Sequence, residues 1–247
     1  MKILLLFSIL SNFQFLFSTQ GFGELRKFGG TLKRRSAIGK ISIESDIFQW
    51  RRIRLVIYGF ENIWMGRDVG PIQLDPQEAD YLLGGGFKTI KDNMWYAIFL
   101  DHTCYHKIDT FVDKSLYWNK LKFVFSNRNL NLKTEPLTFY YRLELGSYLR
   151  HEKIPWLTVG NPNQFDFLLN MFYAHPISNT VMPFLDVSFY SGFTLDYNLT
   201  PEIEVNSGLL LRGISNEGMI YLGFRPIDRK GYREAEGVIY LGLKVKF

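Results

Sequence analysis

The chain has 247 residues, and its 29 Lys and Arg against 24 Asp and Glu give a formal net charge of +5. Hydrophobic residues make up 47% and aromatic residues 17%, which excludes a disordered chain. The single cysteine excludes an intramolecular disulfide framework and a cysteine-based zinc finger, and the mild, dispersed basic charge offers no stripe for binding nucleic acid.

The first twenty residues have the pattern of a secretory signal peptide. Lys2 precedes an apolar run from Ile3 to Leu10, and small or polar residues follow around Ser18–Gly21. Polar residues interrupt the run before it reaches the roughly 18 apolar residues of a membrane-spanning helix. We therefore expect residues 1–20 to be a cleaved signal peptide and residues 21–247 to form one domain.

From residue 41 onwards, apolar and polar residues alternate with the period of two that half-buried strands show. The alternation recurs at residues 41–47, 53–57, 121–125, 137–146, 185–195, 202–212, 220–225 and 239–247. Residues 165–173 also alternate, although the same run would suit a helix. Longer polar stretches at 66–80, 107–117, 127–136 and 150–164 are predicted to be outer loops.

These segments predict an all-β fold, a single antiparallel transmembrane β-barrel of about 12 strands, with ten as the alternative. An even count follows because both ends of a bacterial barrel lie on the periplasmic side. Leu, Ile, Val and Phe would face lipid, while the other parity carries charge, Gly and Tyr, which suits a narrow polar interior. If the apolar parity pointed inward instead, the chain would be a secreted soluble β-barrel that binds a small apolar ligand.

The C-terminal segment is the most regular of these strands. Its apolar positions are Ile239, Leu241, Leu243, Val245 and Phe247. It resembles the terminal strand of Gram-negative outer-membrane proteins, which ends in Phe and is recognised by the barrel-assembly machinery. The resemblance implies the outer membrane of a Gram-negative bacterium, contact with outer-membrane lipid, and assembly through the strand ending at Phe247, but no particular activity.

One cluster of reactive side chains lies in the middle of the sequence. His102, Cys104 and His106 share one face of a strand, so the two imidazoles and the thiol could converge, either for nucleophilic chemistry or around a soft metal. The same parity continues the lipid-facing residues before it, so we expect the strand to end, bulge or leave the membrane near Asp101. The cluster would otherwise be an exposed, hydrogen-bonded group at the barrel rim.

Two resemblances bear on this cluster. The spacing of His102, His106 and Asp109 resembles that of an uncharacterised bacterial family with a His-x-Ser-Ser-His-x-x-Asp motif. In this chain Cys104 and Tyr105 stand where that family has its two serines. The resemblance implies no known activity. Outer-membrane lipid hydrolases are similar in size and topology, and they place His and Ser on a lipid-facing strand with a further residue that orients the His. No His-x-Ser-Asn arrangement is present, but Ser126-Asn127 lies one strand further on and is a candidate for those partners.

The inward parity carries charges of both signs. The predicted lumen charges are Arg52, Arg54, Arg142, Glu144, Glu202, Glu204, Arg212 and Lys244. A paired network that fills the lumen is as compatible with this pattern as a conducting pore. Gly84-Gly85-Gly86 is not followed by the helix that a phosphate-binding loop needs, so no bound cofactor is expected. No bound metal is expected either.

Two functional hypotheses follow from these features. The first is a narrow channel or structural barrel without catalytic activity. The alternative is an outer-membrane lipid or acyl hydrolase that uses His102 and His106 with a nearby nucleophile.

Overall fold

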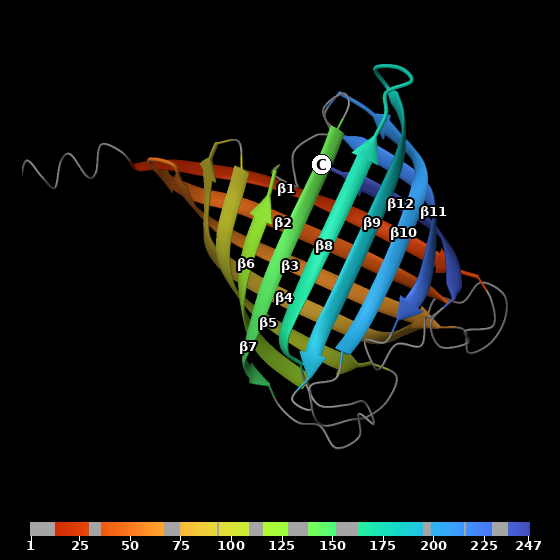
Figure 1. Cartoon of the computed structure of the whole chain (residues 1–247), viewed down its shortest axis with the longest axis horizontal. Coiled ribbons are helices and arrows are strands. Elements are labelled where there is room, and N and C mark those ends of the chain that lie inside the picture. The colour runs from red at the N-terminus through yellow and green to blue at the C-terminus, as the bar shows by residue number, and fades with distance from the viewer. Residues whose placement is uncertain are drawn as a thin grey trace, which may run out of the picture.

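The computed structural model describes residues 13–29, 36–66, 75–92, 94–108, 116–127, 138–151, 163–194, 199–214, 216–228 and 237–247. These residues form a closed barrel in which each strand pairs antiparallel with its neighbours in sequence and β1 closes against β12 (Figure 1). Within the described ranges, no helix is long and apolar enough to cross a membrane. The prediction of an all-β antiparallel barrel of 12 strands is confirmed.

The strands differ in length but are all long enough for a tilted membrane crossing, which needs about 9–11 residues. They are β1 (Phe13–Phe28), β2 (Ala37–Trp50), β3 (Ile53–Gly66), β4 (Asp75–Lys91), β5 (Met94–Lys107), β6 (Leu116–Ser126), β7 (Thr138–His151), β8 (Asn163–Ala174), β9 (Val181–Thr194), β10 (Leu199–Arg212), β11 (Glu217–Asp228) and β12 (Val238–Lys246).

The apolar parity of the strands faces outward. In β12 the side chain of Leu241 is 46% exposed, whereas that of its neighbour Tyr240 is 1% exposed. In β8, which the sequence left open between strand and helix, Phe165 is 56% exposed and Asp166 is 7% exposed. Because a soluble barrel would require the opposite orientation, the outward apolar face supports the membrane type of barrel.

Two of the predicted outer loops differ from the sequence prediction. β4 begins at Asp75, inside the stretch 66–80 that was expected to be a loop. The connection 127–137 joins β6 to β7 at the same end of the barrel as the short β2–β3 and β4–β5 turns, opposite the other predicted outer loops. The prediction failed there because polar composition marks a connection but does not say at which end of the barrel it lies.

β1 was not predicted as a strand, and its first residues overlap the expected signal peptide. Residues 13–20 lie against β2, whereas the register with β12 begins at Phe22. Gly21 and Phe247 exchange two backbone hydrogen bonds of 3.0 Å. The seam that closes the barrel therefore uses residues from Gly21 onwards. The β1–β12 pairing has seven register pairs, whereas the β1–β2 pairing has thirteen.

The interior of the barrel is filled by inward-facing side chains. Val56, Leu210 and Tyr240 are almost fully buried, as are many charged residues. The ring of Tyr240 lies against Gly223, where any larger side chain would collide with it. A wide water-filled bore would leave such inward side chains accessible, so the described strands enclose a packed interior.

Candidate active site on the outer face

β5 places the histidine and cysteine cluster on the outside of the barrel. Leu100 is exposed on the outer face, His102 follows it two positions later, and the half-buried Cys104 comes next with the same parity. The pairing of β5 with β4 is unbroken from Met94 to Lys107. Of the three outcomes expected near Asp101, an end and a bulge of β5 are therefore wrong, and departure from the membrane stays a prediction.

The strand can continue because Asp101 points into the barrel, where its carboxylate has partners. Its side chain is 0% exposed, accepts a hydrogen bond from the Tyr58 hydroxyl, and lies 2.9 Å from Lys122 Nζ. A charge at this position would be costly on the lipid side, but it is compensated on the interior side. Asp101 is thus separated from the histidine that follows it.

The outer face joins three side chains into a hydrogen-bonded chain. His102 lies directly opposite Asn119 in the β5–β6 register, and its Nδ1 is 2.8 Å from Asn119 Oδ1. The other ring nitrogen, Nε2, is 3.2 Å from Cys104 Sγ. Since the amide oxygen can act only as an acceptor, Nδ1 carries the proton and the Nε2 lone pair faces the thiol. This is the order of nucleophile, base and orienting group that defines a catalytic triad.

Tyrosine rings flank the thiol on both neighbouring strands. Tyr117 on β6 and Tyr81 on β4 lie opposite Cys104 in the two registers. The ring centroid of Tyr117 is 6.0 Å from that of His102, and the ring of Tyr81 is 5.5 Å from that of His106. Tyrosines at this position are typical of the girdle where a barrel meets the membrane surface.

The structure does not assemble all the predicted site residues. Asp109 lies outside the described residues, and His106 lies further along the outer face, against Tyr81. Ser126 and Asn127 lie at the other end of β6, where their side chains donate to the backbone carbonyls of β7 at 3.0 and 3.1 Å. Within the described part of the chain, no three His, Cys, Asp or Glu side chains converge as metal ligands.

Sequence reasoning missed Asn119. It precedes Ser126 by seven positions on the same strand, and its role depends on the β5–β6 register. That register cannot be counted from the sequence, because eight residues separate the end of β5 from the start of β6. The signal that was available is the outward parity of Asn119, an amide among lipid-facing residues.

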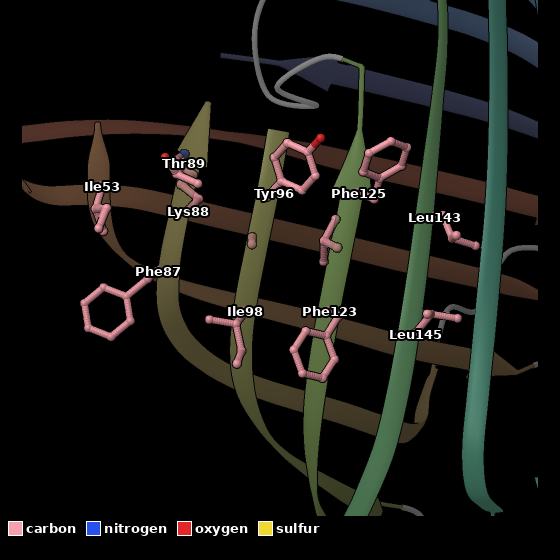
Figure 2. A pocket seen from close by; sticks show the side chains of 12 residues that line it. Ile53, Phe87, Lys88, Thr89, Tyr96, Ile98, Phe123, Phe125, Leu143 and Leu145 are labelled. Carbon is pink, nitrogen blue, oxygen red and sulfur yellow. The ribbon is translucent and has the colours of Figure 1, made fainter. Parts of the chain in front are cut away.

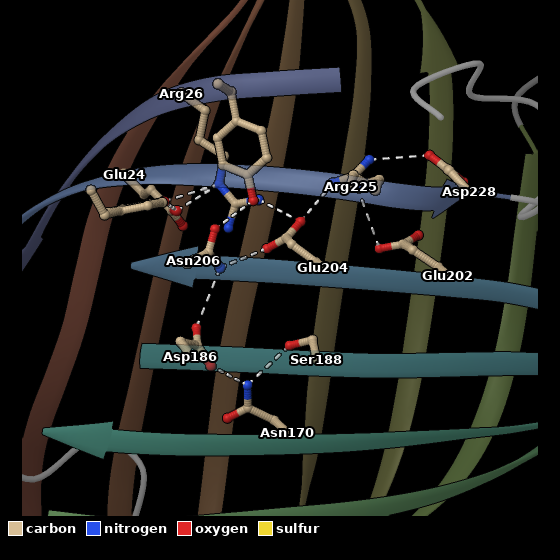
Figure 3. Close-up of polar contacts among 12 residues, drawn as sticks. Glu24, Arg26, Asn170, Asp186, Ser188, Glu202, Glu204, Asn206, Arg225 and Asp228 are labelled. Carbon is tan, nitrogen blue, oxygen red and sulfur yellow. Dashed lines mark hydrogen bonds and ion pairs between the residues drawn. The ribbon is translucent and has the colours of Figure 1, made fainter. Parts of the chain in front are cut away.

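The interior carries a separate network of buried charges along β1, β10 and β11 (Figure 3). Glu204 on β10 lies between two guanidinium groups, with Arg26 at 2.8 Å and Arg225 at 2.7 Å. Arg26 is also 2.6 Å from Glu24, and Arg225 is 3.1 Å from Asp228. Each charge is paired, as burial requires.

Most of the other predicted lumen charges have partners in the interior. The contacts are Arg54–Asp46 at 2.9 Å, Arg142–Glu144, Glu144–Lys122 at 3.7 Å, Glu202–Arg225 at 4.0 Å and Arg212–Glu217 at 3.8 Å, while Lys244 Nζ is 3.9 Å from the Phe22 ring centroid. Arg52 differs from its expected strand position, since it lies exposed in the β2–β3 turn.

Comparisons with known proteins find the fold but no close relative. No family model and no curated protein matches the chain. Among solved structures, outer membrane phospholipase A from Escherichia coli is 11% identical with a TM-score of 0.53, covering 97% of this chain and 95% of that one. LpxR from Salmonella typhimurium is 10% identical with a TM-score of 0.51, covering 93% and 99%. A KdgM porin is 8% identical with a TM-score of 0.48, covering 92% and 98%. The chain therefore has the fold of outer-membrane barrels.

Proposed function

We propose that this protein is an acyl hydrolase of the outer membrane of a Gram-negative bacterium. Cys104 is the nucleophile, His102 the general base, and Asn119 the group that orients the imidazole. The observation that carries the proposal is the chain Asn119–His102–Cys104, with its 2.8 and 3.2 Å contacts on the lipid-facing side of the barrel. Cysteine, histidine and asparagine form the triad of papain-like proteases on an unrelated fold, so these three residue types can serve as nucleophile, base and orienting group.

The reaction has two steps. His102 Nε2 takes the thiol proton as Cys104 Sγ attacks the ester carbonyl carbon; the carbon–oxygen bond then breaks, and the proton passes from Nε2 to the leaving alcohol. A thioester on Cys104 and a free alcohol result. In the second step Nε2 takes a proton from water as its oxygen attacks the thioester carbonyl carbon. The carbon–sulfur bond then breaks, the carboxylic acid leaves, and Nε2 returns the proton to Sγ, which restores the thiol.

The position of the site along the barrel supports an ester of a membrane lipid as substrate. The two-residue turns β2–β3 and β4–β5 mark one end of the barrel, and bacterial barrels have short turns on the periplasmic side. Cys104 lies three residues from the opposite end of β5, roughly 10 Å at about 3.3 Å per residue. This distance supports a position of the thiol at the level of the outer girdle, near the polar headgroups and the ester bonds beneath them.

A conducting channel, the first hypothesis from the sequence, has less support. The buried ion pairs around Glu204 and the packed inward side chains leave little room for solute. The phospholipase among the structural neighbours shares its fold with this chain, and a fold alone carries no activity. The proposal therefore depends on the three side chains of the outer face.

The test is ester hydrolysis by the full barrel in detergent micelles, with medium- and long-chain phospholipid and nitrophenyl ester substrates. We expect turnover by the wild type, and loss to background in Cys104→Ala and His102→Ala. His175→Ala, which changes an exposed histidine beyond β8, is the matched control and should retain full activity. His106→Ala should keep most of its activity, because His102 supplies the base.

A covalent readout complements the kinetics. Rapid quenching with a slowly hydrolysed ester should add one acyl group to Cys104, and neutral hydroxylamine should remove it, as a thioester requires. Turnover that persists in Cys104→Ala, or a wild type that hydrolyses none of these esters, would contradict the proposal.

A further inference from the structure

We infer that a trough on the outer face of β5 binds the acyl chain of the ester substrate and selects long chains. This inference deepens the proposed function and rests on it. The trough begins at the thiol of Cys104 and ends in an apolar pocket about 450 Å³ in volume that lies over β3–β7 (Figure 2).

Two rows of side chains on the five adjacent strands β3–β7 form the pocket. In the row nearer the thiol, Phe87, Ile98, Phe123 and Leu145 are successive register partners on β4, β5, β6 and β7. Ile98 is the short side chain between two phenylalanine rings, so the surface is depressed along β5. Figure 2 shows these rings on either side of Ile98. A depression of that shape accommodates a flexible hydrocarbon chain.

The surface between this pocket and the thiol continues the trough. Leu100 follows Ile98 on the outer face, and its register partner on β4 is Gly85, which has no side chain to cover it. Its partner on β6 is Leu121, so the route from Ile98 to His102 is lined by aliphatic groups. No charge enters the trough from Lys88, since its ammonium group is 2.7 Å from Glu44 inside the barrel.

The length of this route matches the depth of one lipid leaflet. Ile98 is six residues from Cys104, about 20 Å along the strand at roughly 3.3 Å per residue. With a tilt of about 35–45°, Ile98 lies about 15 Å deeper in the membrane. That is half of the hydrocarbon core of about 30 Å. An acyl chain whose ester carbonyl lies at Cys104 would thus reach the pocket with its methyl end.

Aromatic rings close the far end of the pocket. Tyr96 and Phe125 are register partners whose ring centroids are 5.3 Å apart, and Tyr141 lies 5.9 Å from Phe125. A chain that extends beyond Ile98 meets these rings. We therefore expect hydrolysis to rise with chain length until the chain fills the pocket, because each buried methylene stabilises the complex.

The experiment compares octanoyl and palmitoyl esters of the same alcohol, using the full barrel in micelles. Ile98→Trp fills the trough, and Leu241→Trp places the same ring on the exposed outer face of β12 as a matched control. We expect Ile98→Trp to lower kcat/KM at least tenfold for the palmitoyl ester while leaving the octanoyl ester unchanged. Leu241→Trp should change neither. An unaltered ratio between the two esters in Ile98→Trp would overturn the inference while leaving the proposed hydrolase intact.

A second measurement does not depend on turnover. A phospholipid with a photoreactive diazirine at the end of its acyl chain should label the segment around Ile98 and Phe123 several-fold more than the segment around Leu241, in Cys104→Ala as in the wild type. Equal labelling of the two segments would mean that bulk lipid covers the trough, and crosslinks between two barrels there would mean that a second copy does; either result overturns the inference. An inactive wild type with enriched labelling would instead count against the proposed hydrolase alone.

Discussion

Asp101 and His102 are consecutive residues of β5, yet they act on opposite sides of the barrel wall. The Asp101 carboxylate is buried against Tyr58 and Lys122 in the interior, while the His102 imidazole connects Asn119 to Cys104 on the outer face. Strand geometry alone produces this separation, because successive side chains point to opposite faces. One pair of residues therefore contributes both to the charge network of the interior and to the candidate active site.

The Asn119 carboxamide is predicted to be a positioning group. Asn119→Ala should lower kcat/KM about 100-fold, because a misplaced imidazole no longer meets the thiol in line. It should also slow alkylation of Cys104 by iodoacetamide at neutral pH, a readout that a purely structural role would leave unchanged. Asn119→Asp keeps an oxygen opposite His102 Nδ1 and should restore much of the rate. Equal rates in Asn119→Ala and the wild type would remove this residue from the site.

The Glu204 carboxylate is predicted to be important for stability. Glu204→Ala leaves Arg26 and Arg225 facing each other without their shared counter-charge. Breaking a buried ion pair in this way costs about 3–5 kcal/mol. Urea unfolding in micelles, followed by tryptophan fluorescence, should show the lowered midpoint. Arg52→Ala, in the exposed β2–β3 turn, is the control and should leave the midpoint in place; a Glu204→Ala midpoint equal to that of the wild type would show that the network contributes little.

The packed interior predicts a closed barrel. In planar lipid bilayers the wild type should show no stable single-channel conductance. Replacing both Arg26 and Arg225 by Gly removes two large side chains from the lumen and should allow ion flow. A steady conductance in the wild type would favour the channel hypothesis instead.

Removal of residues 1–20 is predicted to leave the barrel closed. The register with β12 starts at Phe22, and Gly21 bonds Phe247, so the seam does not use the overhanging part of β1. A chain beginning at Gly21 should refold in detergent and show the gel shift on heating that is typical of folded barrels. Mass spectrometry of the protein from membranes should give a start near residue 21. A mature protein that retains residues 13–20 would contradict cleavage near residue 21.

The C-terminal phenylalanine is predicted to act in assembly rather than in the folded barrel. Deleting Phe247 removes a single pair of backbone hydrogen bonds at the seam and an exposed ring. Refolding of the purified chain in detergent should therefore be little affected, whereas the amount inserted into the outer membrane of cells should fall several-fold. Equal amounts in cells would contradict recognition of this strand by the assembly machinery.

Alternation with a period of two was enough to predict the barrel and the orientation of its faces. Leu241 and Tyr240 show why: the side-chain period of a strand is fixed, so once apolar residues face lipid every other position faces inward. The same reasoning failed for β1 and β4. The phenylalanines of residues 13–17 also suit the apolar core of a signal peptide, and Gly84–Gly86 interrupts the alternation in β4.

The candidate site was only half predictable. His102 and Cys104 share a face because they are two positions apart, a local relationship that the sequence states directly. Asn119 contacts His102 only through the pairing of β5 with β6. The register of that pairing depends on the connection between the two strands, and it cannot be derived from the sequence. The same limit applies to Arg26 and Glu204, whose contact joins strands at distant points of the chain.

The short seam between β1 and β12 has a consequence for how the barrel forms. Its partners are separated by more than 200 positions, as in Phe22 and Lys246, so this pairing has a far higher contact order than any hairpin in the molecule. Loop-closure entropy delays such contacts until the rest of the sheet is in place. Until then the growing sheet presents two unpaired edges, which are templates for aggregation. A newly exported chain would therefore need protection at those edges until its two ends meet.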